Sequence, residues 1–220
     1  MTIIAVTGLT REAEIVGGDS VIAVAGGGDA KSLAAKLDAL HGDIIGVISV
    51  GLGGGLSPLL KVGDAVIADR IIAGAEIFRC HDGWRVALAA RLPHAHQGAL
   101  AASDIILGAA DAKAALFAAS GGLAVDMESH VAARFAAVRE LPFAALRIIS
   151  DDAAHVLPPA ALVAMKPDGG IAIGRILGSL LRHPLQVPGL IRTARSSKTA
   201  FAELLRCRGL CGAGFAGLDV

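Results

Sequence analysis

Five carboxylates follow apolar stretches of the chain at the points where those stretches end. They are Glu12, Asp126, Glu128, Asp151 and Asp152. In an open α/β sheet the carboxyl ends of parallel strands meet at one edge, so acids from distant parts of the sequence can converge there. Few basic residues lie beside them in the sequence; Arg147 is the nearest to Asp151. The pattern therefore favours general acid and base chemistry on a neutral small molecule over simple ion pairing.

Two alternatives compete with this interpretation. Asp126 would cap a helix that begins just after it, and Glu128 would favour the positive end of the same helix. A divalent metal would also gather carboxylates, but His94 and His96 fall in an expected surface loop, away from the acids. We therefore expect no metal site.

Two glycine clusters suggest backbone that approaches a ligand closely. They are AGGGDAKSL at 25–33 and GLGGGL at 51–56. The dinucleotide fingerprint needs a glycine five residues after the first, but those positions hold Lys31 and Leu56. Both clusters fail this requirement, so we expect no nicotinamide and no other cofactor. The second cluster is predicted to form a loop after a central strand.

The elements that must position these residues alternate between strands and helices, which predicts an α/β sandwich around a mixed or mostly parallel sheet. An edge hairpin through Arg79 and His81–Gly83 is also expected. Strands are expected at 2–7, 20–25, 44–50, 64–73, 97–102, 122–125 and 143–149. Helices are expected in the GLTREAE stretch, at 29–40, at 110–119 and after Glu128.

Composition narrows the class of protein. The 220 residues are 54% hydrophobic but only 3% aromatic, which suits helices packed tightly on a parallel sheet. Net charge is zero, so a nucleic-acid partner is not expected. The three cysteines do not pair into a framework, and no targeting or membrane-spanning segment is evident, so we expect a cytoplasmic protein. Residues 171–220 hold seven Lys and Arg against two acids, which leaves a net charge of −5 on the first 170.

Three strings of residues, in order, resemble the nucleoside phosphorylase/nucleosidase superfamily. They are GGLSPLLKVGDAVIAD at 54–69, VDMES at 125–129 and RIISDDA at 147–153. The resemblance implies a three-layer α/β/α sandwich and an enzyme that cleaves the N-glycosidic bond of a purine nucleoside. It is greatest to the methylthioadenosine/adenosylhomocysteine nucleosidases, and it implies a homo-oligomer.

The resemblance also implies roles for individual residues. Asp151 would be the general acid that protonates N7 of the purine, with Ser150 orienting it. Glu128 would hold the ribose hydroxyls, while Met127 packs against the sugar. Glu12 would be the base that activates water. An ordinary aspartate is ionised at neutral pH, so Asp151 needs burial or a neighbouring carboxylate such as Asp152 to act as an acid.

The sequence departs from the family pattern at two positions. Leu52 replaces a serine that could meet phosphate or sugar, and Ile106 stands where an aromatic residue usually stacks on the base. The other expected substrate contacts are Gly53, Gly54 and Leu107. Arg11 and Gly8 are the candidate phosphate contacts, so water and phosphate both stay open as the nucleophile.

The C-terminal residues resemble the extension of hopanoid-associated phosphorylases, which implies adenosylhopane as the substrate. We divide the chain into a catalytic domain at 1–180 and a basic amphipathic extension at 181–220. Leu190, Ala194, Phe201, Leu204 and Leu205 share one face of the predicted tail helix. That face would either dock on the catalytic domain or contact the inner membrane peripherally. The alternatives are a soluble methylthioadenosine nucleosidase and a non-catalytic nucleoside-binding module.

Overall fold

A computed structural model describes residues 1–164, 166 and 168–217. Its centre is an eight-stranded mixed sheet in the order β2-β1-β3-β7-β6-β4-β5, with β8 paired to both β3 and β4. Strand β2 runs parallel to β1, and β1 and β8 run parallel to β3, whereas β7 is antiparallel to the end of β3. The strands are β1 Thr2–Thr7, β2 Val21–Ala25, β3 Ile44–Gly55, β4 Ala65–Ala73, β5 Glu76–Arg79, β6 His96–Ala102, β7 Ala124–Asp126 and β8 Phe143–Asp151.

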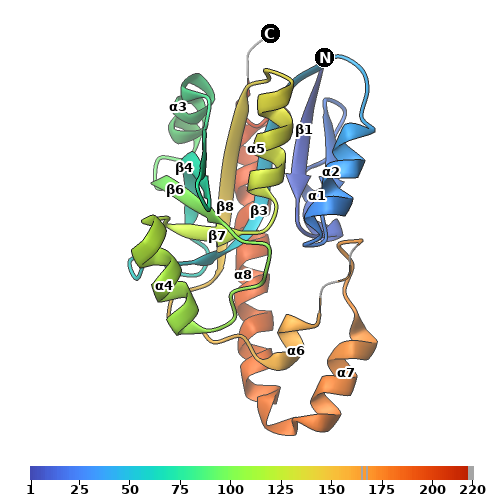
Figure 1. Cartoon of the computed structure of the whole chain (residues 1–220), viewed down its shortest axis with the longest axis vertical. Helices are drawn as coiled ribbons and strands as arrows, with labels where there is room; N and C mark the ends of the chain where they lie inside the picture. The colour runs from blue at the N-terminus through green and yellow to red at the C-terminus, as the bar shows by residue number, and fades with distance from the viewer. Residues whose placement is uncertain (165, 167, 218–220) are drawn as a thin grey trace.

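Helices cover both faces of this sheet, which confirms the predicted three-layer sandwich (Figure 1). Alternate residues of β1 face opposite layers: Ile3 and Ala5 pack with α1, α3 and α8, while Ile4 and Val6 pack with α2 and α5. The helices are α1 Thr10–Val16, α2 Ala30–Asp38, α3 Asp82–Arg91, α4 Ala110–Ser120, α5 Ser129–Val138, α6 Pro159–Leu162, α7 Ile173–Arg182 and α8 Val187–Cys211, with a 3-10 turn, η1, at Pro184–Gln186.

The long helix α8 packs along the sheet, beside β8, β3, α1 and α3. Its buried residues are Ala200, Phe201, Leu204, Cys207 and Cys211. Of the residues predicted to form a membrane-facing side, Phe201 and Leu204 are therefore core residues, while Leu205 is 60% exposed. Membrane contact through that face of α8 is contradicted. The boundary at residue 180 stays a prediction, but the second half of the predicted extension completes the main core.

The structure corrects two expected elements. The glycines at 51–55 continue β3 instead of forming a loop, and they pair with β8 from Arg147 to Asp151. The second correction concerns His81–Gly83, which begins helix α3: the His81 side chain accepts a hydrogen bond from Trp84 N at 3.2 Å. The edge hairpin is confined to β4 and β5.

Candidate active site

Glu12 projects from α1 to the carboxyl ends of β1 and β3 and is 2% exposed. Its Oε2 accepts hydrogen bonds from Gly8 N at 2.8 Å and Leu9 N at 2.7 Å. Its Oε1 accepts one from Leu52 N at 2.8 Å. Burial nevertheless raises the pKa of Glu12, against the opposing effect of these amides. The loop after β1 and the backbone of β3 thus hold one carboxylate in a fixed position.

Glu128 lies opposite Glu12, directly after β7. It is 6% exposed, and its Oε1 accepts a hydrogen bond from Gly28 N at 3.2 Å. A Cβ placed on Gly8 would be 3.3 Å from both Glu128 oxygens and 3.4 Å from Glu12 Oε2, so the two carboxylates flank this glycine. Burial, with the charges of Asp126 and Glu12, raises the pKa of Glu128 to about 8, while Arg147 lowers it.

The glycines of β3 and of the 26–28 turn make room for these acids. A Cβ on Gly51 would lie 2.9 Å from Glu12 Cδ, and one on Gly26 would lie 2.9 Å from Glu128 Cγ. A Cβ on Gly54 would lie 3.3 Å from Asp151 Oδ2, and one on Gly53 would lie 3.0 Å from Val125 O. The predicted close approach is therefore made by buried carboxylates as well as by backbone.

Asp126 has a structural role. Its Oδ1 accepts hydrogen bonds from Glu128 N at 2.9 Å and Ser129 N at 2.7 Å, which fixes the start of α5. Its Oδ2 lies 2.9 Å from Arg147 Nε, and both side chains are 1% exposed. Arg147 in turn donates to Ser49 Oγ at 2.6 Å. The capping interpretation is thus right for Asp126, and this acid belongs to a buried ion pair.

Asp151 is paired with Lys113, a residue that no sequence motif marks as part of a site. Asp151 Oδ2 contacts Lys113 Nζ, and Ser150 Oγ lies 2.7 Å from Asp151 Oδ1, where it can orient the carboxylate. Lys113 is fully buried, and its ammonium also donates to Asp152 O at 2.8 Å and His155 O at 3.4 Å. The expectation that these acids are not simple ion pairs is therefore wrong for Asp126 and Asp151.

Lys113 gave one weak signal in the sequence. It is the only basic residue of the predicted helix at 110–119, which is otherwise almost entirely apolar. Helix α4 buries this residue and no other, because the loop after β8 wraps around its ammonium. Asp152, the carboxylate expected to influence Asp151, accepts from Ala154 N at 3.1 Å and is tied into the turn. The neighbour of Asp151 is thus a cation.

The remaining predicted contacts divide into two groups. Leu107 packs beside Val125 and Leu56, next to the end of β3, while Met127 and Ile106 are half-buried. Arg11 is exposed and lies over the ring of Phe201, 4.3 Å from its centroid. The structure does not bring Arg11 to the carboxylates.

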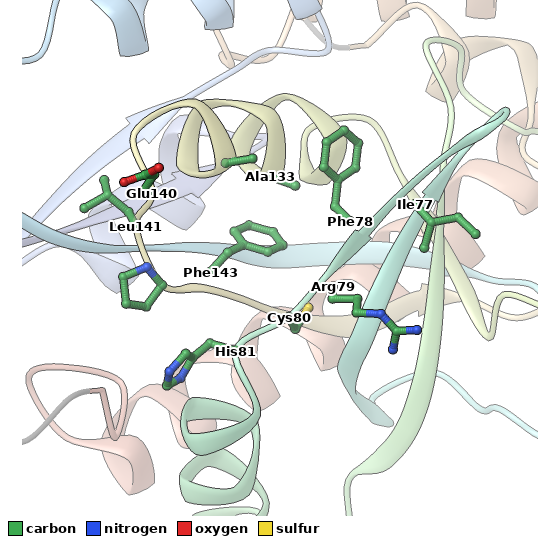
Figure 2. Close-up of a pocket in the computed structure, with 11 residues that line it drawn as sticks. Ile77, Phe78, Arg79, Cys80, His81, Ala133, Glu140, Leu141 and Phe143 are labelled. Atoms are coloured by element: carbon green, nitrogen blue, oxygen red, sulfur yellow. The ribbon is translucent and has the colours of Figure 1, made fainter.

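Two open cavities of about 480 Å³ flank the sheet. The first cavity, shown in Figure 2, is lined by Phe78 of β5, by Cys80, which follows β5, and by Phe143 at the start of β8. Asp151 ends that nine-residue strand, about 26 Å away. Burial raises the pKa of the Cys80 thiol to about 12, so it is a poor nucleophile. This cavity therefore lies away from the acids.

The second cavity lies beside the carboxylates. It is lined by the backbone of Gly27 and Gly28, by Asp29, Ala30, Lys31 and Asp104, and by Arg175 of α7. Gly28 also donates to Glu128, which links this cavity to the carboxylate edge. In the described residues no group of three or more His, Cys, Asp or Glu is arranged to hold a metal ion. The arrangement places buried carboxyl groups at a sheet edge that an open cavity adjoins.

The comparisons agree with this architecture. Residues 75–161 match the family model of the phosphorylase superfamily, a segment that contains Glu128 and Asp151. The chain therefore has a nucleoside phosphorylase-like α/β fold, the class that its sheet and helical layers define. A search of curated protein sequences finds no significant match.

Solved structures give the more specific likeness. A Streptococcus pneumoniae MTA/SAH nucleosidase bound to 8-aminoadenine superposes with a TM-score of 0.62 at 18% identity, covering 93% of this chain and 99% of that one. A point mutant of the Helicobacter pylori nucleosidase with 5′-methylthioadenosine in its active site gives 0.61 at 14% identity, covering 94% and 97%. A mutant futalosine hydrolase of Helicobacter pylori gives 0.57 at 17% identity, covering 68% and 90%. At these identities the likeness establishes the fold.

Proposed function

We propose that this protein is a purine nucleosidase that releases adenine from an adenine nucleoside, with water as the nucleophile. One observation carries the proposal: Glu12 and Glu128, two buried carboxyl groups without an ion-pair partner among the described residues, lie at the same edge of the sheet as the Asp151–Lys113 pair. The fold, shared with nucleosidases that bind adenine compounds, supports the same reaction.

Glu128 accepts hydrogen bonds from the ribose hydroxyls, and Met127 packs against the sugar. As the glycosidic bond breaks, positive charge develops on the ribosyl ring. The Glu12 carboxylate is proposed to stabilise this charge, while Glu128 orients the sugar through its hydrogen bonds. The fixed positions of the two side chains require little reorganisation. The half-buried Ile106 and Leu107 contact the base in place of an aromatic ring, and the backbone of Gly53 and Gly54 completes the pocket.

Two protons move in the proposed reaction. Asp151 delivers one to N7 of the purine so that adenine leaves as a neutral base, and Lys113 supplies that proton to Asp151 through their contact. Water attacks the ribosyl carbon and gives its proton to Glu12, leaving ribose with a new hydroxyl. Glu12 then loses its proton and Lys113 regains one from solvent, which restores the enzyme.

Water is favoured over phosphate by the positions of the two candidate phosphate contacts. Gly8 N already donates to Glu12, and the Arg11 guanidinium lies over Phe201. The buried side chains of Glu12 and Glu128 would also disfavour a phosphate dianion between them, and the basic residues of the adjoining cavity, Lys31 and Arg175, line its wall beside Gly27 and Gly28. We therefore propose hydrolysis and no phosphate co-substrate.

We propose adenosylhopane, an intermediate of hopanoid synthesis, as the nucleoside. Two features support it: the resemblance of the C-terminal residues to hopanoid-associated proteins, and the apolar surface described below. We place the protein in the cytoplasm, peripheral to the inner membrane, as a homo-oligomer. The alternative is a soluble nucleoside, methylthioadenosine or adenosylhomocysteine, and only the similarity to solved nucleosidase structures favours it.

The test is to incubate the full-length protein with adenosylhopane in detergent and, separately, with methylthioadenosine, in ¹⁸O-labelled water with and without phosphate. We expect free adenine without phosphate and one ¹⁸O atom in the sugar. Glu12→Gln should abolish the release. A sugar 1-phosphate product would assign phosphorolysis, and binding of nucleoside without any adenine release would assign a binding module.

A further inference from the structure

Helix α7 is amphipathic but buries none of its residues. At about 100° per residue, its apolar residues fall within an arc of about 140°. Arg175 and Arg182 lie on the opposite side. A helix of this pattern normally packs its apolar stripe on a core, yet Leu177 is 55% exposed and Leu181 is 87% exposed. Ile176 and Leu180 are half-buried, whereas the exposed part of the stripe, which includes Leu177 and Leu181, has no partner in the described chain.

Neighbouring segments enlarge this exposed stripe. Helix α6 packs beside α7, and α7 is followed directly by η1 and the start of α8. Figure 1 shows α6 and α7 together at one end of the molecule, beyond the sheet and beside the lower part of α8. The exposed apolar residues are Leu162, Val163, Ile171, Ile173, Leu177, Leu181, Leu185, Val187 and Ile191, which we term the α7 surface. Clustered apolar exposure on this scale marks an interaction site.

The charges around the α7 surface specify the kind of partner. From 169 to 202 the chain holds five basic residues and no acid. They are Arg175, Arg182, Arg192, Arg195 and Lys198. A symmetric dimer would place this positive segment opposite its own copy, where like charges repel. An anionic partner with an apolar interior satisfies both properties.

We infer that the α7 surface docks on an anionic lipid bilayer, with α7 lying in the plane of the interface. Its leucines would enter the boundary between head groups and acyl chains, while its arginines attract anionic lipids. No helix in the described part of the chain is long and apolar enough to cross a membrane, so the contact is with the surface. This docking site differs from the face of α8 that the sequence suggested.

The α7 surface adjoins the candidate active site. Arg175 lines the cavity whose other wall is Gly27 and Gly28, and Gly28 donates to Glu128. The Gly169 carbonyl, in the segment before α7, accepts from Thr10 N at 3.0 Å, two residues from Glu12. Docking would therefore hold the mouth of the site at the lipid surface. This consequence rests on the proposed function: it lets a nucleoside with a lipid substituent reach the carboxylates while its lipid stays in the bilayer.

The loop after Asp151 gives a second link. His155 Nε2 lies 3.0 Å from Thr193 Oγ1 of α8, and Ala160 N donates to Gln186 Oε1 at 2.8 Å. This loop also carries the carbonyls that bind Lys113. The segment that meets the bilayer is thus joined by hydrogen bonds to the segment that holds the proton source.

The docking is tested by flotation of the full-length protein with vesicles of phosphatidylcholine, with and without phosphatidylglycerol. We expect the protein to float with the anionic vesicles and to be released by salt. Leu177→Ser/Leu181→Ser should lose flotation. Arg175→Gln/Arg182→Gln should bind about 30-fold more weakly, at about 1 kcal/mol for each arginine near the surface.

The matched control is Leu59→Ser/Val138→Ser, which removes two exposed apolar side chains, 79% and 80% exposed, from other parts of the surface. It should float like the wild type, and circular dichroism should show all variants folded. The proposal is overturned if the wild-type protein does not float with anionic vesicles. It is also overturned if Leu177→Ser/Leu181→Ser floats as the wild type does. If the wild-type protein is an oligomer that does not bind vesicles, and Leu177→Ser/Leu181→Ser dissociates it, the α7 surface is instead a contact with a second copy of the chain.

Docking and catalysis can fail separately in these experiments. Hydrolysis of soluble methylthioadenosine needs no vesicle, so it should persist in Leu177→Ser/Leu181→Ser. A protein that floats but releases no adenine from any nucleoside would overturn the proposed function and leave the docking intact. A protein that releases adenine but does not float with anionic vesicles would overturn the docking and leave the proposed function intact.

Discussion

The four buried carboxylates at the sheet edge fall into two pairs with different surroundings. Asp126 contacts the buried guanidinium of Arg147, and Asp151 contacts the buried ammonium of Lys113. Glu12 and Glu128 accept hydrogen bonds from backbone amides, and burial raises the pKa of both side chains. Acids whose environments differ in this way can take different roles in one reaction. In the proposed reaction Asp151 acts together with Lys113, while Glu12 and Glu128 act without a cationic partner.

Lys113→Met tests the role of the cation beside Asp151. The change keeps a long side chain in the buried site but removes the ammonium that we propose as the proton source. We expect kcat for adenine release to fall by about 10²-fold or more, with KM nearly unchanged, because Lys113 contacts Asp151 rather than substrate.

Steady-state kinetics and thermal unfolding of this variant should be measured together. A merely structural role for Lys113 would lower the unfolding temperature and leave kcat of the folded fraction near the wild-type value. That result would remove Lys113 from the mechanism.

Glu128→Gln should change how stability depends on pH. The pKa of Glu128 is raised from 4.5 to about 8 in the folded protein, mainly by burial. Between these values the folded state keeps a proton that the unfolded state loses, so rising pH favours unfolding. The free energy of unfolding of Glu128→Gln, relative to wild type, should therefore increase from pH 5 to pH 8 in urea titrations. A constant difference would show that Glu128 ionises normally.

The positions of several candidate site residues could be predicted, because the acids follow strands whose carboxyl ends meet at one edge of the sheet. Glu12, Glu128, Ser150 and Asp151 all lie at the sheet edge, as expected. Lys113 could not be found, because a lone lysine in a helix looks like a surface residue until the loop after β8 is placed around it. Arg11 was misplaced because α8 supplies Phe201, a partner almost two hundred residues away in the sequence.

Among the elements, β3 has the most direct effect on the site. Gly51→Ala would place a methyl group 2.9 Å from the Glu12 carboxyl group, closer than real Cβ contacts allow. We expect Glu12 to shift, the free energy of unfolding to fall by about 1–3 kcal/mol, and adenine release to drop with it. Urea unfolding and activity assays of the same preparation measure both effects.

The matched control is Gly209→Ala in the interior of α8, where an added Cβ meets no atom within 4 Å. It should raise stability by about 0.5–1 kcal/mol and leave activity unchanged, because alanine favours a helix over glycine. If Gly51→Ala behaves like this control, the glycine is not required for the approach of Glu12.

Most of the strands and helices were predictable from apolar periodicity. The exceptions have local causes. Glycine-rich β3 looked like a loop because glycine is rare inside strands, and only the buried carboxylates explain its presence. Helix α3 was missed because His81, Asp82 and Gly83 resemble a turn, whereas the histidine ring caps the helix.

For the molecule as a whole, the C-terminal helix belongs to the fold. Phe201 is 9% exposed within the core that α8 shares with the sheet. Phe201→Ala should lower the free energy of unfolding by about 3–5 kcal/mol. The exposed neighbour Leu205, changed to Ala, is the control and should have a small effect in the same denaturation assay.

Equal stability of these two variants would contradict the packing of α8. For the same reason, a chain ending near Leu181 should not fold, because it lacks Phe201, Leu204 and Phe215. Point variants on the α7 surface are therefore the appropriate test of membrane docking, since they leave the core intact.

The central claim is that the carboxylate edge cleaves an adenine nucleoside, and one measurement tests it most directly. Adenine release from methylthioadenosine and from adenosylhopane is followed by chromatography for wild type and Asp151→Asn, with nucleoside binding measured in parallel. We predict release by wild type and a loss of about 10²–10⁴-fold in Asp151→Asn, with binding retained. Equal release by the two proteins, or no adenine from either nucleoside, would contradict the account.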